Sequence, residues 1–432
     1  MPARIGIISE HKPGEGRIPL TPSQIAQLQL DHSDLTITVQ PSSQRVFEDA
    51  EFLDRQIPMS ADLQDANLVM AVKEIEIENL HSHQAYLYFS HTIKGQDYNM
   101  PMLKHILNKG ATLLDYELIR DHHDRRLVFF GRHAGLAGMV NTLWSYGQRL
   151  QVLGVENPFL NIKQAQDYKD LNEIKLAIKA AGEEISAWMA SRPAVVIGIT
   201  GYGNVSKGAQ EILANLPMHA ISAEDLLTID LDQHQGQLIQ VVFTEEDMFE
   251  PIDPQAEFIL QEYFNHPEKY QAKFQPYLEK MDILVNCIYW DTPYPRLITL
   301  EEIKSHYAGD PSLMVVGDIT CDIDGAIQFN TSATLSPAPT YVFNVDSGER
   351  MMGFQGQGPL VMAVDNLPTE LPRESSEAFG EALLPFVYAM GACDYQVDFE
   401  ELDLPPEVKR AVIAHDGKLA PDYAYLKDFL EG

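Results

Sequence analysis

The sequence predicts an α/β protein built of two doubly wound parallel sheets. Short apolar runs rich in β-branched residues recur with helical stretches between them, and these runs lack the polar alternation of a strand with one wet face. A glycine-rich turn of the dinucleotide-binding type follows one such run in the middle of the chain. Because 432 residues exceed what one hydrophobic core usually serves, we expect two or three domains of roughly 150 residues each.

Composition and charge exclude several classes of protein. The net charge of −32 would repel phosphate backbones and anionic membrane surfaces, so we expect neither nucleic acid nor membrane as a partner. No segment approaches 18 consecutive apolar residues, and the first residues contain no signal-peptide core. Cys287, Cys321 and Cys393 lack metal-ligand spacing, which predicts reduced thiols, no metal site and a cytoplasmic location.

The first domain is expected over residues 1–140, completed by residues 346–432. Its buried strands are predicted from five apolar runs, at residues 5–8, 35–39, 68–72, 85–89 and 111–114. The loop GEGRIPLTP leads into a helix, for which Thr21 is the expected cap and Pro22 the first helical residue. The C-terminal stretch opens with the glycine-rich loop GFQGQGP and continues into a helix from about residue 375 to 390, with a serine cap. This stretch is too small for a domain, so it should pack against the first one.

The second domain is expected over residues 141–345. Between Asp170 and Trp188, apolar residues spaced by three and four positions predict a helix. A buried strand at 194–200 precedes the glycine turn, and further buried runs at 283–289 and 313–319 follow at the spacing of a doubly wound sheet.

The glycine turn has the pattern GxGxxS between a strand and a helix, and its residues are Gly201, Tyr202, Gly203, Asn204, Val205 and Ser206. Gly201 permits the tight turn, and Gly203 lets backbone N–H groups approach a pyrophosphate at the helix N-terminus. Gly208 falls where helix and strand should pack closely. GxGxxS alone is a weak motif, but the flanking strand and helix favour a nucleotide site.

The position that contacts the adenosine ribose is expected about 20 residues further on, near Ser222. Glu224 and Asp225 follow it, and we expect them to form a solvated helix start rather than to act as ligands. No Arg lies nearby to hold a 2′-phosphate, yet an uncharged Ser would not repel one. NAD and NADP therefore both stay open, with NADPH slightly favoured.

Ionisable residues gather where the first domain's strands end, which is the binding edge of an open parallel sheet. They are Arg17, Lys73, His91 and Glu117, with Arg125 and Arg126 close after them. Each could be a solvated strand end or a surface ion pair on its own, but their common edge favours a site. A lysine here stays cationic beside a carboxylate, or becomes a base if it is desolvated near other cations.

Several segments of the chain resemble a known family: GEGRIPLTP, MAVKE, YFSHTIKGQ, LLDYELI, FGRHAGLAGMVN, TGYGNVSKGAQ, NCIYW, GDITCD and VDNLPTELPRESSEAFGEALLP. They are similar to the lysine–2-oxoglutarate reductase part of α-aminoadipic semialdehyde synthase, to lysine-forming saccharopine dehydrogenases and, more distantly, to alanine dehydrogenases. The resemblance implies two Rossmann-like domains with an interdomain cleft. It implies an oxidoreductase of lysine metabolism and amino-acid degradation, in which lysine, 2-oxoglutarate and NAD(P)H reversibly give saccharopine, NAD(P) and water.

The same resemblance implies roles for individual residues. Lys73 and His91 would be the catalytic acid–base pair, with Glu117 modulating Lys73. An opposite charge favours the ammonium, so we expect Glu117 to raise the pKa of Lys73. The implied substrate-binding positions are Arg17, Gln96, Arg126 and Phe130. The implied cofactor-binding positions are Arg125, Gly201, Gly203, Asn204, Val205, Ser206, Tyr289, Ile319, Asp365, Asn366 and Leu367.

The chain departs from the fungal pattern within the glycine turn. Val205 replaces a cysteine, so a disulfide to Cys287 is impossible, and Thr200 and Ser206 replace glycines, which leaves cofactor choice open. The chain stops at Gly432, so only the saccharopine-forming step is expected. The alternatives are another amino-acid or opine dehydrogenase of the alanine dehydrogenase type and a non-catalytic amino-acid sensor. Small molecules are the expected partners, and a homo-oligomer stays open.

Overall fold

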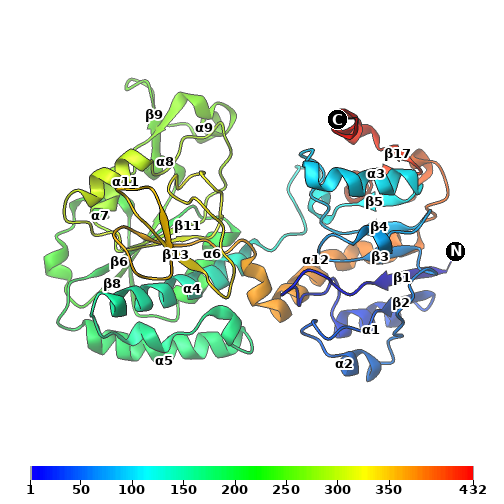
Figure 1. Cartoon of the computed structure of the whole chain (residues 1–432), viewed down its shortest axis with the longest axis horizontal. Coiled ribbons are helices and arrows are strands. Elements are labelled where there is room, and N and C mark those ends of the chain that lie inside the picture. Colours follow the sequence, from blue (N-terminus) through cyan, green and yellow to red (C-terminus); the bar gives the residue numbers. More distant parts are fainter. Residues whose placement is uncertain (1, 432) are drawn as a thin grey trace. The chain divides into compact units, whose positions relative to one another are not determined.

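The computed structural model describes residues 2–431 and divides the chain into two compact units (Figure 1). Residues 1–130 and 372–432 form the first unit, and residues 131–371 form the second. The first unit is thus discontinuous, but its boundaries differ from the predicted 140/141 and 345/346. Helix α4 (Gly131–Val152) packs as a whole on the second sheet, and strand β15 (Leu360–Met362) extends that sheet beyond residue 345.

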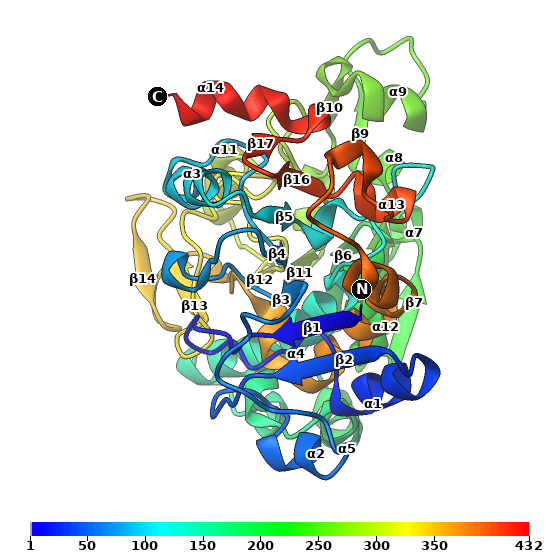
Figure 2. The ribbon, with the colours of Figure 1, turned by 90° about the vertical axis from the view of Figure 1, so that its right-hand side faces the viewer.

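The first unit contains a sheet of seven strands in the order β17-β16-β5-β4-β3-β1-β2 (Figure 2). Its parallel strands, all predicted from apolar runs, are β1 (Ala3–Ile7), β2 (Leu35–Val39), β3 (Leu68–Met70), β4 (Ala85–Leu87) and β5 (Thr112–Leu114). The C-terminal stretch adds two antiparallel strands that the sequence analysis missed, β16 (Val412–His415) and β17 (Lys418–Leu419). Several strands end earlier than their apolar runs, which continue into the loops that follow.

The helices of the first unit are α1 (Pro22–Asp31), α2 (Asp49–Leu53), α3 (Met100–Asn108), α12 (Pro372–Ala392), α13 (Pro406–Lys409) and α14 (Lys427–Leu430). The predicted start of α1 is confirmed, because Thr21 caps it and Pro22 is its first residue. The predicted serine cap of α12 is wrong. That helix already begins at Pro372, and the Ser376 hydroxyl lies buried inside it, accepting the N–H of Ile18 at 3.0 Å. Ser376 therefore ties α12 to the loop before α1.

The second unit contains a sheet of eight strands in the order β14-β13-β15-β12-β11-β6-β8-β7. Its parallel strands are β6 (Val195–Thr200), β7 (Met218–Ile221), β8 (Leu238–Phe243), β11 (Ile283–Asn286), β12 (Val315–Asp318) and β15. Two antiparallel strands, β13 (Thr340–Phe343) and β14 (Arg350–Met352), close one edge, and β9 (Phe249–Pro251) pairs with β10 (Tyr270–Ala272) outside the sheet.

The remaining helices of this unit are α5 (Leu171–Met189), α6 (Asn204–Leu213), α7 (Ala223–Thr228), α8 (Glu245–Met248), α9 (Leu260–Asn265), α10 (Gln275–Leu278) and α11 (Leu300–Tyr307). Helix α5 matches its prediction, with Asp170 as its cap. Gly208 was expected to allow close packing of its helix against a strand. In the structure it allows close packing against helix α4, because a Cβ there would collide with the Arg132 carbonyl. Among residues 2–431, no helix has the length and apolarity that a membrane span requires.

Candidate functional site

Lys73 and His91 lie together at the carboxyl edge of the first sheet. They follow β3 and β4, which are neighbouring parallel strands, so both side chains leave the sheet at the same edge. The ring of Phe89 lies against both of them: its centroid is 5.2 Å from Nζ of Lys73 and 3.6 Å from the centroid of His91. The structure thus brings the amine and the imidazole to one aromatic neighbour.

Glu74 is the direct partner of His91, and the sequence analysis did not single it out. Its carboxylate contacts Nδ1 of His91, and both side chains are about one quarter exposed. Burial alone would raise the pKa of Glu74, but the hydrogen bond and charge of His91 outweigh burial and lower it to about 2. His91 itself adopts a left-handed backbone conformation with φ of 50°. The ring is therefore held by an anionic acceptor from the adjacent strand.

The surroundings of Lys73 correct the role expected of Glu117. Burial lowers the pKa of the Lys73 ammonium, and the cations Arg17 and Lys12 lower it further, against the opposing charges of Glu15 and Glu74. The sequence analysis expected Glu117 to raise this pKa. In the structure the carboxylate of Glu117 instead bonds the guanidinium of Arg126.

Glu10 fixes the backbone that carries Lys73. Its carboxyl oxygens accept the N–H groups of Val72 at 2.5 Å and Lys73 at 3.1 Å. Burial raises the pKa of Glu10 to about 8, although these two hydrogen bonds work in the opposite direction. No sequence motif distinguishes this glutamate from others, because its role depends on a loop after β1 reaching the end of β3.

Asp115 performs a similar task between β4 and β5. Its carboxylate accepts the N–H and hydroxyl of Ser90 at 2.8 and 2.7 Å, and the N–H of Glu117 at 2.9 Å. Burial raises the pKa of Asp115 to about 6, against the effect of the Ser90 bonds. The loop that carries His91 is thereby fastened to the neighbouring strand.

The predicted substrate-binding residues lie in different settings. Arg17 is only 2% exposed and forms two hydrogen bonds with Glu15, at 2.7 and 2.6 Å, while its guanidinium stacks 4.3 Å from the centroid of Phe130. Gln96 bonds the backbone of its own loop through the N–H of Lys94. Arg126 is partly exposed beside Glu117 and has the accessibility that a substrate carboxylate needs.

The glycine turn of the second unit fits a dinucleotide. Gly201 has a φ of 76°, and Gly203 immediately precedes α6. A Cβ at Gly203 would meet nothing within 4 Å, so the space over the turn is open to a pyrophosphate. Asn204, Val205 and Ser206 form the first turn of α6, as predicted.

The other predicted cofactor residues of this unit follow strands close to β6. Tyr289, Ile319 and Asp365 come after β11, β12 and β15, and Leu367 is buried just beyond Asn366. Arg125 belongs to the first unit, where it is exposed and pairs with Asp121.

A buried polar network, absent from the sequence predictions, fastens these strand ends to one another. Asn286 accepts the hydroxyl of Thr200 at 2.9 Å and donates to Asp318 at 2.8 Å, and Asn330 donates to Asp318 at 2.7 Å. Burial raises the pKa of Asp318. The network joins β6, β11 and β12 at the edge where the glycine turn begins, so it positions the turn rather than the ligand.

Ser222 does not occupy the place that the sequence analysis assigned to it. It follows β7, the outermost strand, and β8 lies between β7 and β6. Its hydroxyl caps α7 by accepting the N–H of Asp225 at 3.0 Å, which confirms that Glu224 and Asp225 form a helix start. The spacing of about 20 residues misled because the outer strand, β7, precedes the inner strand, β8, in the sequence.

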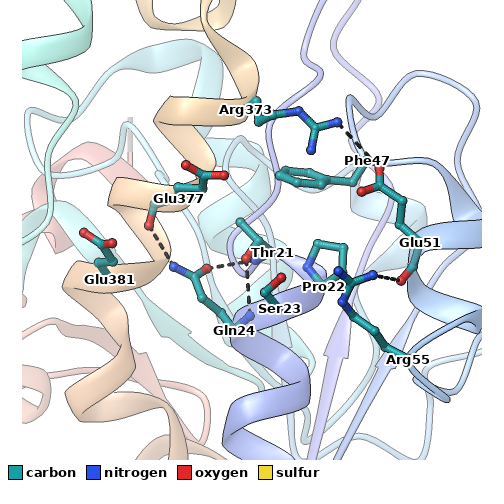
Figure 3. Close-up of a pocket in the computed structure, with 10 residues that line it drawn as sticks. All are labelled: Thr21, Pro22, Ser23, Gln24, Phe47, Glu51, Arg55, Arg373, Glu377 and Glu381. Carbon is teal, nitrogen blue, oxygen red and sulfur yellow. Dashed lines mark hydrogen bonds and ion pairs between the residues drawn. The ribbon is translucent and has the colours of Figure 1, made fainter. Parts of the chain in front are cut away.

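A separate hollow of about 330 Å³ lies in the first unit between α1, α2 and α12 (Figure 3). Several of its polar groups already have partners within the chain: Gln24 donates to the carbonyl of Glu377 at 2.8 Å, and Arg373 lies 3.6 Å from Glu51. None of the predicted site residues lines it. We therefore assign it no part in the site.

Comparisons with known proteins agree with this architecture. The family model for the alanine dehydrogenase/PNT N-terminal domain matches residues 6–137. The α-aminoadipic semialdehyde synthase of Arabidopsis thaliana is 38% identical over 98% of this chain and 41% of its own length, and the mitochondrial synthase of Bos taurus is 33% identical over 96% and 46%. A saccharopine dehydrogenase (NAD(+), L-lysine-forming) of Schizosaccharomyces pombe is 28% identical over 89% of this chain and 92% of its own. The chain thus spans less than half of the two synthases.

Solved structures show the same fold at low sequence identity. An L-alanine dehydrogenase, 14% identical, superposes with a TM-score of 0.64 over 99% of both chains. A transhydrogenase from Sinorhizobium meliloti, 16% identical, gives 0.52 over 97% of this chain and 99% of its own. These likenesses confirm the predicted α/β class with two mainly parallel sheets. The chain is homologous to the α-aminoadipic semialdehyde synthases and the lysine-forming saccharopine dehydrogenases, and it is related to alanine dehydrogenase.

Proposed function

We propose that this chain is an NAD(P)-dependent oxidoreductase that reversibly forms saccharopine from L-lysine and 2-oxoglutarate. The names of its relatives supply the reaction. The observation that carries the proposal is the group formed by Lys73, Glu74 and His91, which places an amine and an oriented imidazole at one edge of the sheet. An oriented imidazole beside an amine can supply the proton transfers that this reaction requires.

Proton transfers dominate the chemistry of this reaction. The ε-amine of the substrate lysine attacks the ketone, water leaves the carbinolamine, and the resulting imine is reduced. We assign His91 to protonate the departing hydroxyl and Lys73 to protonate the nitrogen as it becomes a secondary amine. In the reverse direction Lys73 removes that proton and His91 activates water. The lowered pKa of Lys73 suits a group that must both give and take a proton.

Substrate recognition must provide for three carboxylates in saccharopine. A guanidinium binds a carboxylate with two parallel hydrogen bonds, so arginine is the expected partner. Arg126 is the better candidate because it is partly exposed, and a substrate carboxylate would take over its bond to Glu117. Arg17 is buried with Glu15 and acts on the site through its charge near Lys73.

The second unit would hold the nicotinamide dinucleotide, which supplies or accepts a hydride when it is bound. The backbone of Gly201, Gly203 and Asn204 would bind its pyrophosphate. The buried network around Asp318 keeps the turn in place. The reaction therefore needs both units, one for the dinucleotide and one for the acid–base side chains.

The test measures oxidation of NADH and of NADPH by the purified chain. Lysine with 2-oxoglutarate is compared with pyruvate and ammonia, and saccharopine is identified in the product by mass spectrometry. Saccharopine formation that depends on Lys73 supports the proposal. Turnover only with pyruvate and ammonia would favour an alanine dehydrogenase type of enzyme, and binding of lysine without any turnover would favour a sensor.

The expected location rests on the cysteines. Cys287, Cys321 and Cys393 are all unpaired, as a reducing compartment requires. We propose the cytoplasm, although the Bos taurus relative is named mitochondrial.

A further inference from the structure

The backbone that carries Lys73 leaves the first sheet just before the lysine. Strand β3 ends at Met70, whose carbonyl still accepts the N–H of Ile8 at 3.1 Å. The next residue, Ala71, donates its N–H to a carbonyl of β4 at 3.0 Å. Val72 is fully buried, so its peptide groups cannot turn to water and need partners within the protein. Two side chains from other segments supply those partners.

Glu10 accepts two consecutive N–H groups of this backbone. One of its carboxyl oxygens accepts the N–H of Val72 at 2.5 Å, and the other accepts the N–H of Lys73 at 3.1 Å. Glu10 is itself well anchored, because it lies two residues after Ile8, which is still bonded to the sheet. A carboxylate accepts hydrogen bonds with both oxygens, whereas an amide has one acceptor oxygen, so glutamine could not make both bonds.

Tyr116 bonds the same stretch of backbone through its side-chain hydroxyl, which donates to the carbonyl of Val72 at 2.8 Å. Burial raises the pKa of this hydroxyl well above its usual value, so it keeps the proton that it donates. Its ring packs edge to face on Phe379 of α12, with centroids 4.7 Å apart. It also lies 6.0 Å from the ring of Phe89, which contacts Lys73.

The peptide bond that joins Val72 to Lys73 is thus held at both of its polar groups. Tyr116 binds its carbonyl and Glu10 binds its N–H. The two side chains come from different segments, the loop after β1 and the turn after β5. Because a peptide bond is planar, holding both groups fixes its plane. This plane sets the direction in which the lysine side chain leaves the backbone.

We propose that Glu10 and Tyr116 are positioning residues for Lys73, which fix the backbone from which its amine reaches the reacting nitrogen. The proposal rests on the acid–base role of Lys73 in the proposed function. Neither side chain has to touch the substrate. A misplacement of about 1 Å can cost a reaction about a hundredfold in rate, so losing one of these bonds should lower kcat. Affinity for the dinucleotide, which the second unit would hold, should not change.

The first measurement is amide hydrogen exchange at Val72 and Lys73 in the full chain, by mass spectrometry at residue resolution and without substrate. Glu10→Gln keeps the shape of the side chain but turns an amide N–H toward one of the two backbone N–H groups. We expect exchange at these amides to rise about tenfold or more. Glu78→Gln, at an exposed glutamate, is the control and should leave exchange unchanged. Unchanged exchange in Glu10→Gln would overturn the proposal.

The second measurement is kcat for saccharopine formation. Glu10→Gln and Tyr116→Phe should each lower kcat about tenfold or more and leave the KM for NADH unchanged. Tyr88→Phe is the matched control, because its buried hydroxyl follows the neighbouring strand β4 but bonds the sulfur of Met102 at 2.9 Å. This control should keep the kcat of the wild type. If Glu10→Gln does not fold, Tyr116→Phe, which removes a single oxygen atom, decides the question.

Combination with Lys73→Met separates positioning from general damage to the site. If the two residues act through Lys73, adding Glu10→Gln or Tyr116→Phe to Lys73→Met should not lower the residual rate further. Added to Glu74→Gln, which impairs His91 instead, the same changes should still lower kcat. A further loss in the Lys73→Met background would overturn the proposal, as would single variants with the kcat of the controls.

The two measurements also distinguish this proposal from the proposed function. A wild type that forms no saccharopine would overturn the proposed reaction, and hydrogen exchange would then decide alone whether Glu10 holds this backbone. Normal saccharopine formation, with exchange and kcat unchanged in Glu10→Gln, would overturn only the positioning role.

Discussion

Nδ1 of His91 faces the carboxylate of Glu74, and this contact joins the ends of two neighbouring strands of the first sheet. A carboxylate only accepts hydrogen bonds, so the proton must reside on Nδ1 of the imidazole. Nε2 is then the atom left to exchange protons with a substrate. Glu74 thus fixes both the orientation and the tautomer of the ring.

Replacing Glu74 by Gln should lower kcat by at least about tenfold, but by less than the 10²–10⁴-fold that the acid–base group itself typically contributes. The amide can donate as well as accept, so it no longer enforces the proton on Nδ1. The measurement is kcat at saturating lysine, 2-oxoglutarate and NADH. Glu78→Gln, an exposed glutamate four residues further on, is the control. A kcat equal to that of the control would contradict the role of Glu74.

Replacing Lys73 by Met should reduce turnover by about 10²–10⁴-fold and leave NADH affinity unchanged. In the reductive direction the ammonium donates a proton, so the rate falls as pH rises through its pKa. Because burial and Arg17 lower this pKa, the alkaline decline should begin below the range of an ordinary lysine. The measurement is the pH profile of kcat/KM. If the residual rate of the Met variant kept the same alkaline decline, that decline would belong to a group other than Lys73.

Replacing Glu117 by Gln should act on substrate binding more than on the pH profile. Its carboxylate is bonded to Arg126, so its loss frees the guanidinium for a substrate carboxylate and changes the KM for 2-oxoglutarate or lysine. Steady-state kinetics with each substrate varied in turn separates KM from kcat. A shift of the alkaline decline with an unchanged KM would instead restore the sequence-based view that Glu117 acts on Lys73.

Replacing Arg17 by Met should destabilise the protein by about 3–5 kcal/mol, because it leaves the buried Glu15 carboxylate without its partner. The double variant with Glu15→Gln should lose less than the two single variants combined. Urea unfolding at neutral pH measures these differences. Replacing Arg120, which is one-third exposed and pairs with the exposed Asp124, should cost less, about 1 kcal/mol. Equal losses at the two arginines would show that burial of the Arg17 pair is unimportant.

Local sequence patterns predicted those helices and strands whose position depends on neighbouring residues alone. Thr21 followed by Pro22 predicted the start of α1, and the spacing of Ile174, Ile178 and Ile185 predicted α5. The parallel strands of the first sheet followed from apolar runs, which placed Lys73 and His91 at one sheet edge, whereas β7, β8 and β15 of the second sheet were not predicted. Such features require only neighbours in sequence, so a single chain reveals them.

Features that depend on strand order could not be read in the same way. Ser222 was assigned to the ribose because distance along the sequence was taken as distance in space. In the sheet, β8 lies between the strand of the glycine turn, β6, and the strand before Ser222, β7. Glu10 and Asp318 depend on partners from other strands, so nothing adjacent in sequence distinguishes them. Ser375 looked like a helix cap because the pattern of a cap is also satisfied by serines buried within α12.

Gly203 and Gly208 lie five positions apart, yet alanine should impair a different property at each position, cofactor binding at Gly203 and stability at Gly208. At Gly203 an added Cβ meets no protein atom within 4 Å, so Gly203→Ala should keep the Tm and weaken NADH binding by blocking the approach of the pyrophosphate. At Gly208 the Cβ collides with the backbone of α4, so Gly208→Ala should lose about 1–3 kcal/mol or more of stability. Calorimetry gives both Tm and NADH affinity. A Gly203→Ala variant with normal NADH binding would mean that the turn does not hold a pyrophosphate, whatever the fate of Gly208→Ala.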